Sequence, residues 1–236
     1  TQSRSSAASD VYKRQEMEAV IFDVDGTIWD SAKEVAESWT EAFQNYPESK
    51  GKVLTAADLE PYMGLTMEAI GEGLLPGLEK ERREEIMCYA MEYENIYLAK
   101  HPGRFFPDFV STVKSLEKAG KKLFIVSNCQ SGYIEAMLTA AGLAFGEGQL
   151  IRDIECFGNT GKSKAENIRL VMERNGLSRE KTVYLGDTAL DRASAKECGI
   201  PFIFASYGFG NPESFEEKIT CLKELPEALE RLAKRG

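Results

Sequence analysis

The order of apolar and polar segments along the chain predicts an α/β fold. Short, almost wholly apolar runs recur at intervals, and each one ends in a polar or glycine-rich turn. They lie at residues 18–22, 122–126, 154–157, 182–185 and 201–205. Runs of this length and composition are typical of strands that are buried on both faces of a parallel sheet.

Apolar residues recur at helical spacing between these runs. We expect helices at residues 109–119, 131–141, 164–175 and 191–198, and a final amphipathic helix over 213–234 that is interrupted around Pro226. A glycine directly follows each of the first four, as is typical of helix C-terminal ends. The alternation of strand and helix predicts a doubly wound parallel sheet, a Rossmann-like α/β core.

One long segment departs from this alternation. Residues 30–104 contain no convincing strand, and helical patterns occupy 32–43, 56–62, 67–73 and 79–99. Because the segment directly follows the first strand, we expect a smaller all-helical cap domain there, inserted into a core made of residues 17–29 and 105–236. A second helical layer of the same domain is the alternative. Residues 1–16 are polar and rich in Ser and Ala, and we expect a disordered or non-native tail.

Composition narrows the possible partners and the compartment. The chain has 236 residues with 29 basic and 38 acidic side chains, a net charge of −9. This balance argues against nucleic acid or an anionic membrane surface as a partner, because both reward a basic face. No apolar run approaches the ~20 residues of a membrane span. The five scattered cysteines include no C-x-x-C pair, so we expect a cytoplasmic protein rather than a disulfide framework or a zinc site.

Polar residues gather where the predicted strands end. They are Asp23, Asp25, Ser127, Asn128, a lysine after the third run, and Asp187. Ligands of open α/β sheets bind at the carboxyl ends of the strands. Three acids there indicate a hard cation with oxygen ligands, and Mg²⁺ is the expected one. A hydroxyl, an amide and a lysine beside such a metal are the groups needed to hold a phosphoryl group.

In this order, these residues resemble the motifs of the haloacid dehalogenase (HAD) superfamily of phosphohydrolases. F-D-V-D-G-T (residues 22–27) is similar to the first motif, D-x-D-G-[TV], and V-S-N (126–128) to the second. A lysine at 164 or 162 would be the third motif, and L-G-D-T-A-L-D (185–191) resembles the fourth, G-D-x-x-x-D. The Y-G-F-G segment (207–210) and the helical insert resemble the phosphoglycolate-phosphatase-like branch.

The resemblance implies a role for each matching residue. Asp23 would be the nucleophile that forms an aspartyl-phosphate, and Asp25 the acid and base that protonates the leaving alcohol and activates water. The Mg²⁺ ligands would be Asp23, the backbone carbonyl of Asp25, and Asp187, with Asp191 as support behind them. Thr27, Ser127, Asn128 and the lysine would bind the phosphate.

Two positions leave questions open. Lys164 opens a helical K-x-E-N-I pattern that resembles related phosphatases, whereas Lys162 has the longer spacing to Gly176 seen with another form of the motif; we favour Lys164. Trp29 stands where the family usually has an aliphatic residue, and either packs in the core or shapes the substrate pocket.

The function we expect is Mg²⁺-dependent hydrolysis of a small phosphorylated metabolite, of phosphoglycolate or sugar-phosphate type, by a monomer or homodimer. Asp25 argues against the dehalogenases and phosphonatases of the superfamily, which lack it. Pyrophosphate or nucleotide hydrolysis, phosphoglucomutase-like transfer and a catalytically silent binding protein are the alternatives. Substrate choice should depend on the cap, where the candidates are Tyr62, Met63, Lys50, Lys52 and Arg82.

Overall fold

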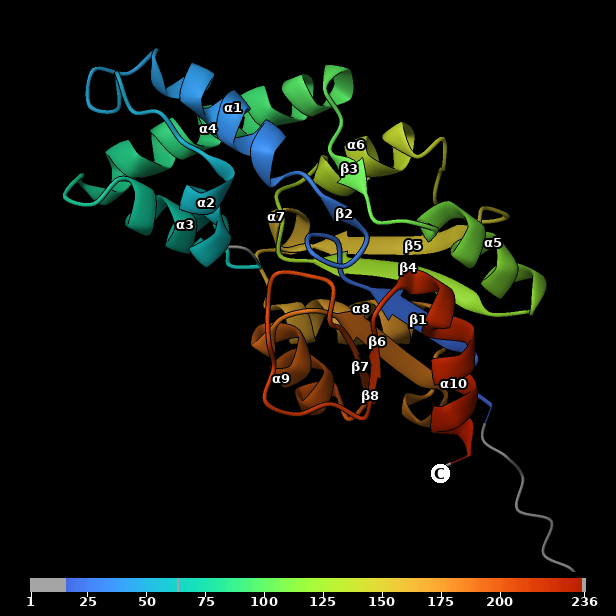
Figure 1. Ribbon diagram of the computed structural model, residues 1–236. Helices are drawn as coiled ribbons and strands as arrows, with labels where there is room; N and C mark the ends of the chain where they lie inside the picture. Colours follow the sequence, from blue (N-terminus) through green and yellow to red (C-terminus); the bar gives the residue numbers. More distant parts are fainter. Residues whose placement is uncertain (1–15, 63, 235–236) are drawn as a thin grey trace, which may run out of the picture.

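Six parallel strands form the central sheet of the protein, in the order β5-β4-β1-β6-β7-β8 (Figure 1). The structure, a computed structural model, describes residues 16–62 and 64–234. The strands are β1 (Ala19–Phe22), β4 (Lys122–Ser127), β5 (Ile151–Cys156), β6 (Thr182–Gly186), β7 (Phe202–Ala205) and β8 (Glu217–Ile219). Strand β1 lies between β4 and β6 and is buried throughout, as its apolar sequence predicted.

Helices cover both faces of this sheet. On one face, α5 (Phe109–Lys118), α6 (Tyr133–Ala140) and α10 (Leu225–Ala233) form one apolar core with the strands. On the other face, α8 (Lys164–Arg174) and α9 (Ala189–Cys198) form a second one. The prediction of a doubly wound α/β fold is therefore confirmed.

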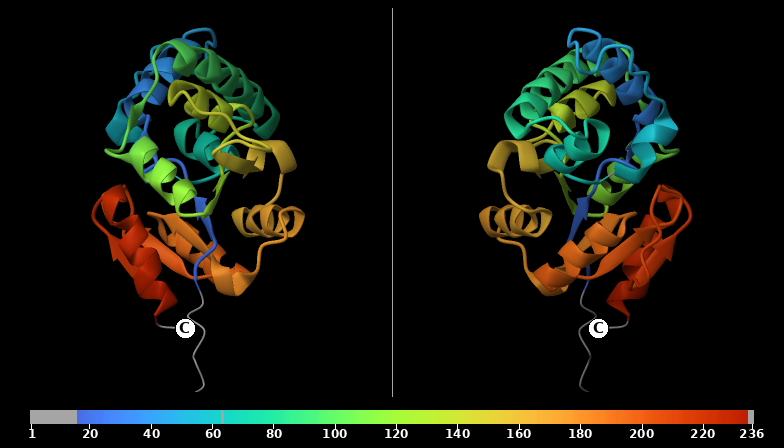
Figure 2. Two further views of the ribbon diagram at one scale, coloured as in Figure 1. Left: turned by 90° about the vertical axis from the view of Figure 1, so that its right-hand side faces the viewer. Right: turned by 90° about the vertical axis from the view of Figure 1, so that its left-hand side faces the viewer.

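A helical cap lies at one end of the sheet (Figure 2). Its elements are α1 (Ala32–Phe43), α2 (Ala56–Leu59), the 3₁₀ turn η1 (Glu60–Tyr62), α3 (Met67–Leu74) and α4 (Lys80–Lys100). These elements have an apolar core of their own, centred on Trp39, Phe43 and Ile86. Helix α4 also packs against α6 of the sheet domain. None of the helices in the described part of the chain has both the length and the apolar composition that crossing a membrane requires.

Cap and sheet are joined by a small antiparallel ribbon that the hydrophobic pattern did not predict. Strand β2 (Trp29–Asp30) pairs with β3 (Arg104–Phe105), and the Arg104 guanidinium lies 3.2 Å from the Asp30 carboxylate. Trp29 is fully buried against Phe105 and Tyr133, with ring centroids 5.5 and 5.8 Å away. The two chain segments that enter and leave the cap are thus held side by side.

Two predicted elements have different bounds in the structure. Strand β5 begins at Ile151 and ends at Cys156, and the residues after it form the short helix α7 (Phe157–Thr160). The helix predicted over 213–234 is wrong in its first half, where β8 pairs with β7 and is followed by the 3₁₀ turn η3 (Leu222–Glu224). Pro226 lies in the first turn of α10, where a missing N–H breaks no helical hydrogen bond, so it does not interrupt a helix.

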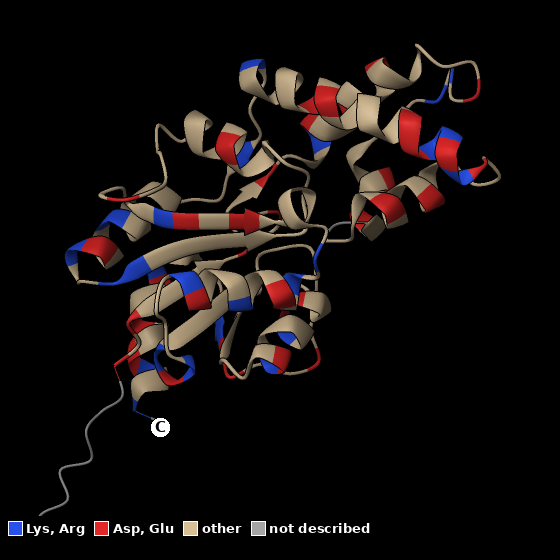
Figure 3. Ribbon diagram, turned by 180° about the vertical axis from the view of Figure 1, so that it is seen from behind, with Lys and Arg blue, Asp and Glu red and all other residues tan. Residues whose placement is uncertain are grey.

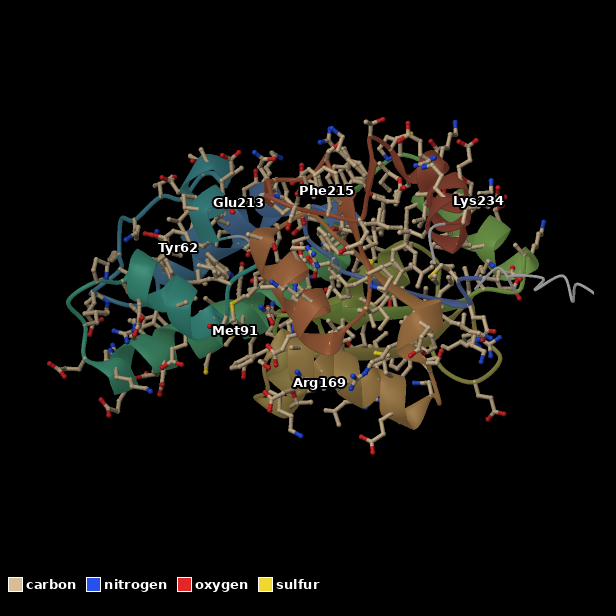
Figure 4. All side chains as sticks on the ribbon, turned by 90° about the horizontal axis from the view of Figure 1, so that it is seen from below. Tyr62, Met91, Arg169, Glu213, Phe215 and Lys234 are labelled. Carbon is tan, nitrogen blue, oxygen red and sulfur yellow. The ribbon has the colours of Figure 1, made fainter. Side chains whose placement is uncertain are left out.

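The predicted tail, residues 1–16, lies outside the described residues except for Glu16, which forms an ion pair with Lys121 at 2.6 Å. The described chain ends beyond α10, and Lys234 lies at the end of the molecule away from the cap residue Tyr62 (Figure 4).

Candidate active site

The polar residues that the sequence singled out meet where β1, β4 and β6 end. Asp23 directly follows β1, Ser127 is the last residue of β4, and Asp187 directly follows β6. Strand β1 lies between β4 and β6. From β4 the chain continues to β5 at one edge of the sheet, and from β6 it continues to β7 toward the other edge, so the site lies where the strand order reverses. This is the usual ligand position in open α/β sheets.

Lys164 joins two of the acids. It is the first residue of α8, and its Nζ lies 3.0 Å from Asp23 Oδ1 and 2.6 Å from Asp191 Oδ1. Its side chain is only 1% exposed. Burial alone lowers the pKa of Lys164, but the carboxylates of Asp191 and Asp23 outweigh it and hold that pKa above its ordinary value. The lysine is therefore a permanent cation inside the site, whereas Lys162 is exposed.

Asp191 is held by a full set of hydrogen bonds. Its Oδ2 accepts from the backbone N–H groups of Asp187 at 3.1 Å and Thr188 at 2.9 Å, and from the Thr188 hydroxyl at 2.7 Å. The Thr188 hydroxyl in turn accepts from Asp191 N–H, which closes a capping box at the start of α9. With Lys164 on its Oδ1, Asp191 orients the lysine and the loop that carries Asp187.

Two glycines make room for Asp187. A Cβ at Gly26 would lie 2.3 Å from Asp187 Oδ2, and a Cβ at Gly208 would lie 2.6 Å from the same atom. Gly26 also has φ of +77°, a conformation that disfavours other residues. The same oxygen accepts from the N–H groups of Phe209 at 2.8 Å and Gly210 at 3.2 Å. The glycines of the first motif and of the Y-G-F-G segment therefore let the backbone approach this carboxylate.

The acids form a set of oxygen donors that fits a hard divalent cation. Carboxylate oxygens of Asp23, Asp187 and Asp191 all lie within 4.8 Å of one another. Burial and the charge of Asp191 raise the pKa of Asp23 well above its ordinary range and that of Asp187 to about 7. One buried lysine does not balance these acids, so a bound cation would favour their ionised forms. The resemblance to the superfamily predicts Asp23 and Asp187 as the ligands of the ion, and Asp191, which pairs with Lys164 through Oδ1, as their support.

Asp25 belongs to a different hydrogen-bond network, which reasoning from the sequence missed. The Tyr133 hydroxyl donates to Asp25 Oδ1 at 2.6 Å and itself accepts from Trp29 Nε1–H at 3.1 Å. The Ser31 hydroxyl lies 2.6 Å from the same phenol oxygen. Burial raises the pKa of Asp25 to about 6, and the hydrogen bond from Tyr133 opposes the rise. A carboxyl group with this pKa can both give and take a proton near neutral pH.

The predicted phosphate-binding side chains have varied partners. Ser127 is buried beside Asp25 at the end of β4. The Asn128 amide donates to the carbonyl of Gly64 in the cap at 2.9 Å, so it also joins cap and sheet. The Thr27 hydroxyl, fully buried, donates to Asp187 Oδ1 at 3.2 Å. Thr27 thus contacts a carboxylate, where the sequence led us to expect a phosphate contact.

A cavity of about 50 Å³ lies between the sheet and the cap, and we call it the cap pocket. Asp25, Ser127 and Asn128 line it from the sheet, and Trp39, Tyr62 and Glu94 from the cap. Glu94, on α4, is 2% exposed and accepts from Trp39 Nε1–H at 2.6 Å and from the Gln130 amide at 2.9 Å. Reasoning from the sequence missed Glu94, although it stands in one buried row of α4 with Ile86, Ala90 and Leu98 at four-residue spacing.

Of the cap residues suggested by the sequence, Tyr62 lines this pocket. Arg82 instead pairs with Glu48 and Glu85 on the surface, Lys52 donates to the carbonyl of Leu74, and Lys50 is exposed. Met63 lies outside the described residues.

Comparison with known proteins places the chain in a family. The sequence profile of the haloacid dehalogenase-like hydrolases matches residues 20–205. The chain is a haloacid dehalogenase-like hydrolase. It is 28% identical over 200 residues to a phosphoglycolate phosphatase of Aquifex aeolicus (strain VF5), a match that covers 82% of this chain and 86% of that protein. It is also 28% identical over 193 residues to a probable phosphatase, IndB, of Dickeya dadantii (strain 3937), covering 80% and 81%.

Solved structures share the fold of this chain. A haloacid dehalogenase-like hydrolase from Bacteroides fragilis superposes with a TM-score of 0.75 at 20% identity, over 89% of this chain and all of that one. The predicted membership in the superfamily, in its phosphoglycolate-phosphatase-like branch, is confirmed, and so is the prediction that this hydrolase is a phosphatase. Its D-x-D-G-T, S-N, lysine and G-D-x-x-x-D segments are the residues assembled in the site described above.

Proposed function

We propose that this hydrolase is a Mg²⁺-dependent phosphatase that cleaves the phosphate monoester of a small metabolite, of phosphoglycolate or sugar-phosphate type, through an aspartyl-phosphate. The observation that carries the proposal is the buried Lys164, held between Asp23 and Asp191 beside Asp187. A buried cation among three buried acids, at the ligand-binding end of the sheet, is suited to an anion that arrives together with a metal ion.

Mg²⁺ would be held by the carboxylates of Asp23 and Asp187 and by the backbone carbonyl of Asp25, with Asp191 holding the neighbouring loop in place. When bound, the ion supplies positive charge that draws the phosphate to the acids and stabilises charge in the transition state. Without compensation, one carboxylate charge about 4 Å from one phosphate charge is opposed by about 4 kcal/mol at an effective dielectric constant of 20.

The side chains of the site divide the reaction into two steps. A carboxylate oxygen of Asp23 bonds to phosphorus while the bond from phosphorus to the alcohol oxygen breaks, and Asp25 gives its proton to that oxygen. Asp25 then takes a proton from water, whose oxygen bonds to phosphorus as the bond to Asp23 breaks. Lys164, Ser127 and Asn128 would hold the phosphate oxygens during both steps. A pKa of about 6 suits Asp25 to this exchange.

We propose the same division of the chain that the sequence suggested. Residues 30–104 act as the cap, residues 17–29 and 105–236 as the core, and the ribbon of β2 and β3 joins the two at residues 30 and 104. The cap would close the site against water and shape the pocket for the leaving alcohol.

Hydrolysis of an aryl phosphate tests this function. We expect turnover that requires Mg²⁺, is abolished by a chelator, and is lost in Asp23→Asn and Lys164→Met. The matched control is Lys162→Met, because Lys162 is exposed on the same segment and should not affect turnover. Robust turnover by Asp23→Asn would exclude Asp23 as the nucleophile, and equal losses in the two lysine variants would exclude the assignment of Lys164.

A further inference from the structure

The charge of the cap pocket restricts what can bind in it. Among the described residues that line it, none is Lys, Arg or His, and Met63, which falls between two of them, is uncharged. Lys164 is the cation of the proposed phosphate site, where it donates hydrogen bonds to Asp23 and Asp191. A carboxylate on the leaving half of a substrate would therefore be buried here without a counter-charge, which is strongly unfavourable.

The same pocket is rich in hydrogen-bond acceptors. Asn128 Oδ1 and Gln130 Oε1 are buried, and no described residue donates a hydrogen bond to either. Both residues are fixed by their amide nitrogens, which donate to Gly64 O and to Glu94 Oε1. Because a buried acceptor without a donor is unfavourable, these oxygens are suited to a ligand that brings hydrogen-bond donors.

Glu94 adds a third acceptor and a possible charge. Its carboxyl group is held in a fixed orientation by Trp39 and Gln130 at 2.6 and 2.9 Å. Burial raises the pKa of Glu94 to about 8, and the nearby charge of Asp25 contributes to the rise. Glu94 can therefore meet an uncharged hydroxyl group as a neutral acid, or ionise opposite an ammonium group.

Size limits the ligand further. A cavity of about 50 Å³ has room for roughly four water-sized groups, since each needs about 10–15 Å³. Apolar side chains of the cap, among them Val35, Leu59 and Ile70, form much of the remaining wall. A leaving alcohol of a few heavy atoms fits this space.

We propose that the leaving alcohol of the substrate is small, carries no negative charge, and offers hydroxyl or ammonium hydrogens to Glu94, Asn128 and Gln130. The inference rests on the proposed phosphatase function and refines it. Of the two substrate types expected above, it favours a phosphorylated short polyol or amino alcohol over a carboxylate such as 2-phosphoglycolate. Glu94 is then a specificity-determining residue that the cap contributes to the pocket.

Four phosphate monoesters of nearly equal size test the inference on the unaltered protein. They are 2-hydroxyethyl phosphate, phosphoethanolamine, propyl phosphate and 2-phosphoglycolate, compared by kcat/KM with Mg²⁺ present. We expect one or both of the first two to exceed 2-phosphoglycolate and propyl phosphate at least about 10-fold. If kcat/KM is highest for 2-hydroxyethyl phosphate, the substrate is a polyol ester. If it is highest for phosphoethanolamine, the substrate is an amino alcohol ester. A kcat/KM for 2-phosphoglycolate or propyl phosphate equal to or above both overturns the inference.

The variant Glu94→Gln tests the role of the carboxyl group, with Glu92→Gln as the matched control on the exposed side of the same helix. We expect Glu94→Gln to lower kcat/KM for the preferred ester about 10-fold, mainly through KM, and to reduce its advantage over 2-phosphoglycolate. An equal loss of kcat on all four esters would show a merely structural role and contradict the assignment.

Turnover of an aryl phosphate distinguishes a failure of the proposed phosphatase function from a failure of the inference about the leaving alcohol. If the aryl ester is hydrolysed with Mg²⁺ but 2-phosphoglycolate ranks first of the four, the proposed function stands and the inference about the alcohol is wrong. If neither the aryl ester nor any of the four is hydrolysed, the proposed function itself fails, and the inference with it.

Discussion

At the scale of single residues, Tyr133 connects the carboxyl group of Asp25 to the joint between cap and sheet. Its hydroxyl donates to Asp25 at 2.6 Å and accepts from Trp29, whose ring is fully buried at the start of the ribbon. The unusual tryptophan after the first motif thus has a structural purpose beyond packing. It orients the phenol that orients the acid.

Removal of this hydroxyl in Tyr133→Phe should lower kcat on an aryl phosphate about 10-fold, because Asp25 loses its orienting donor. The KM should change little, since the phosphate contacts remain. The control is Tyr184→Phe, which also loses a buried hydrogen bond, to the carbonyl of Val126, but does not touch Asp25. A similar loss of kcat in both variants would mean that general destabilisation, rather than the orientation of Asp25, explains the effect.

Glu94 should make the stability of the protein depend on pH. Its pKa rises from 4.5 to about 8 on folding because of burial, so the folded state retains a proton that the unfolded chain has lost. The free energy of unfolding contributed by this group is present below pH 4.5 and is lost as the pH rises towards 8.

Urea denaturation of the unaltered protein and of Glu94→Gln from pH 5 to pH 8 measures this effect. The free energy of unfolding of the variant should rise relative to that of the unaltered protein by up to about 1.4 kcal/mol per pH unit. Glu92→Gln should show no such trend. A pH-independent difference for Glu94→Gln would contradict the raised pKa.

The sequence predicted those site residues that follow strand ends, and it missed those that reach the site from elsewhere. Asp23 and Asp187 lie within a few residues of buried apolar runs, so their place at one edge of the sheet followed from the pattern and the resemblance. Tyr133 and Glu94 lie in helices, and their partners are 108 and 55 positions away along the chain, Asp25 and Trp39. Nothing in the local spacing marks such long-range pairs.

At the scale of elements, the strands of the sheet interior were predictable, and the short edge strand β8 was not. β1, β4 and β6 are buried on both faces and therefore have continuous apolar sequences. β8 lies at the sheet edge, and its central Lys218 is exposed between buried Glu217 and Ile219. Three residues of this kind cannot be distinguished from a helical turn without the partner strand β7.

The ribbon of β2 and β3 is a second element that only the tertiary structure specifies. Each of its strands has two residues, too few for any periodicity. The whole cap lies between the two strands in sequence, so no local pattern links them. Packing of Trp29 on Phe105 and the ion pair of Arg104 with Asp30 stabilise the joint. A change in cap position would therefore reach Asp25 through Trp29 and Tyr133.

At the scale of the whole molecule, the net charge of −9 is compatible with an anionic substrate because the charges are separated in space. Acidic and basic side chains are interspersed over the helices (Figure 3). In contrast, four acids are concentrated near the strand ends around Lys164. They are Asp23, Asp25, Asp187 and Asp191. The local excess of acid is suited to a cation that would reverse the sign of the charge in the site.

A metal ion that binds this cluster only in the folded state must stabilise the fold. At a free Mg²⁺ concentration 100 times the dissociation constant, the gain is about 2.7 kcal/mol, which corresponds to a rise in Tm of roughly 5–10 °C for a chain of this size. Thermal unfolding with and without MgCl₂, against NaCl of equal ionic strength, measures the rise. Asp187→Asn should abolish most of it, whereas Glu92→Gln should preserve it. An identical rise in NaCl would mean that screening of surface charge, rather than a bound ion, raises Tm. An identical rise in Asp187→Asn would place the bound cation elsewhere.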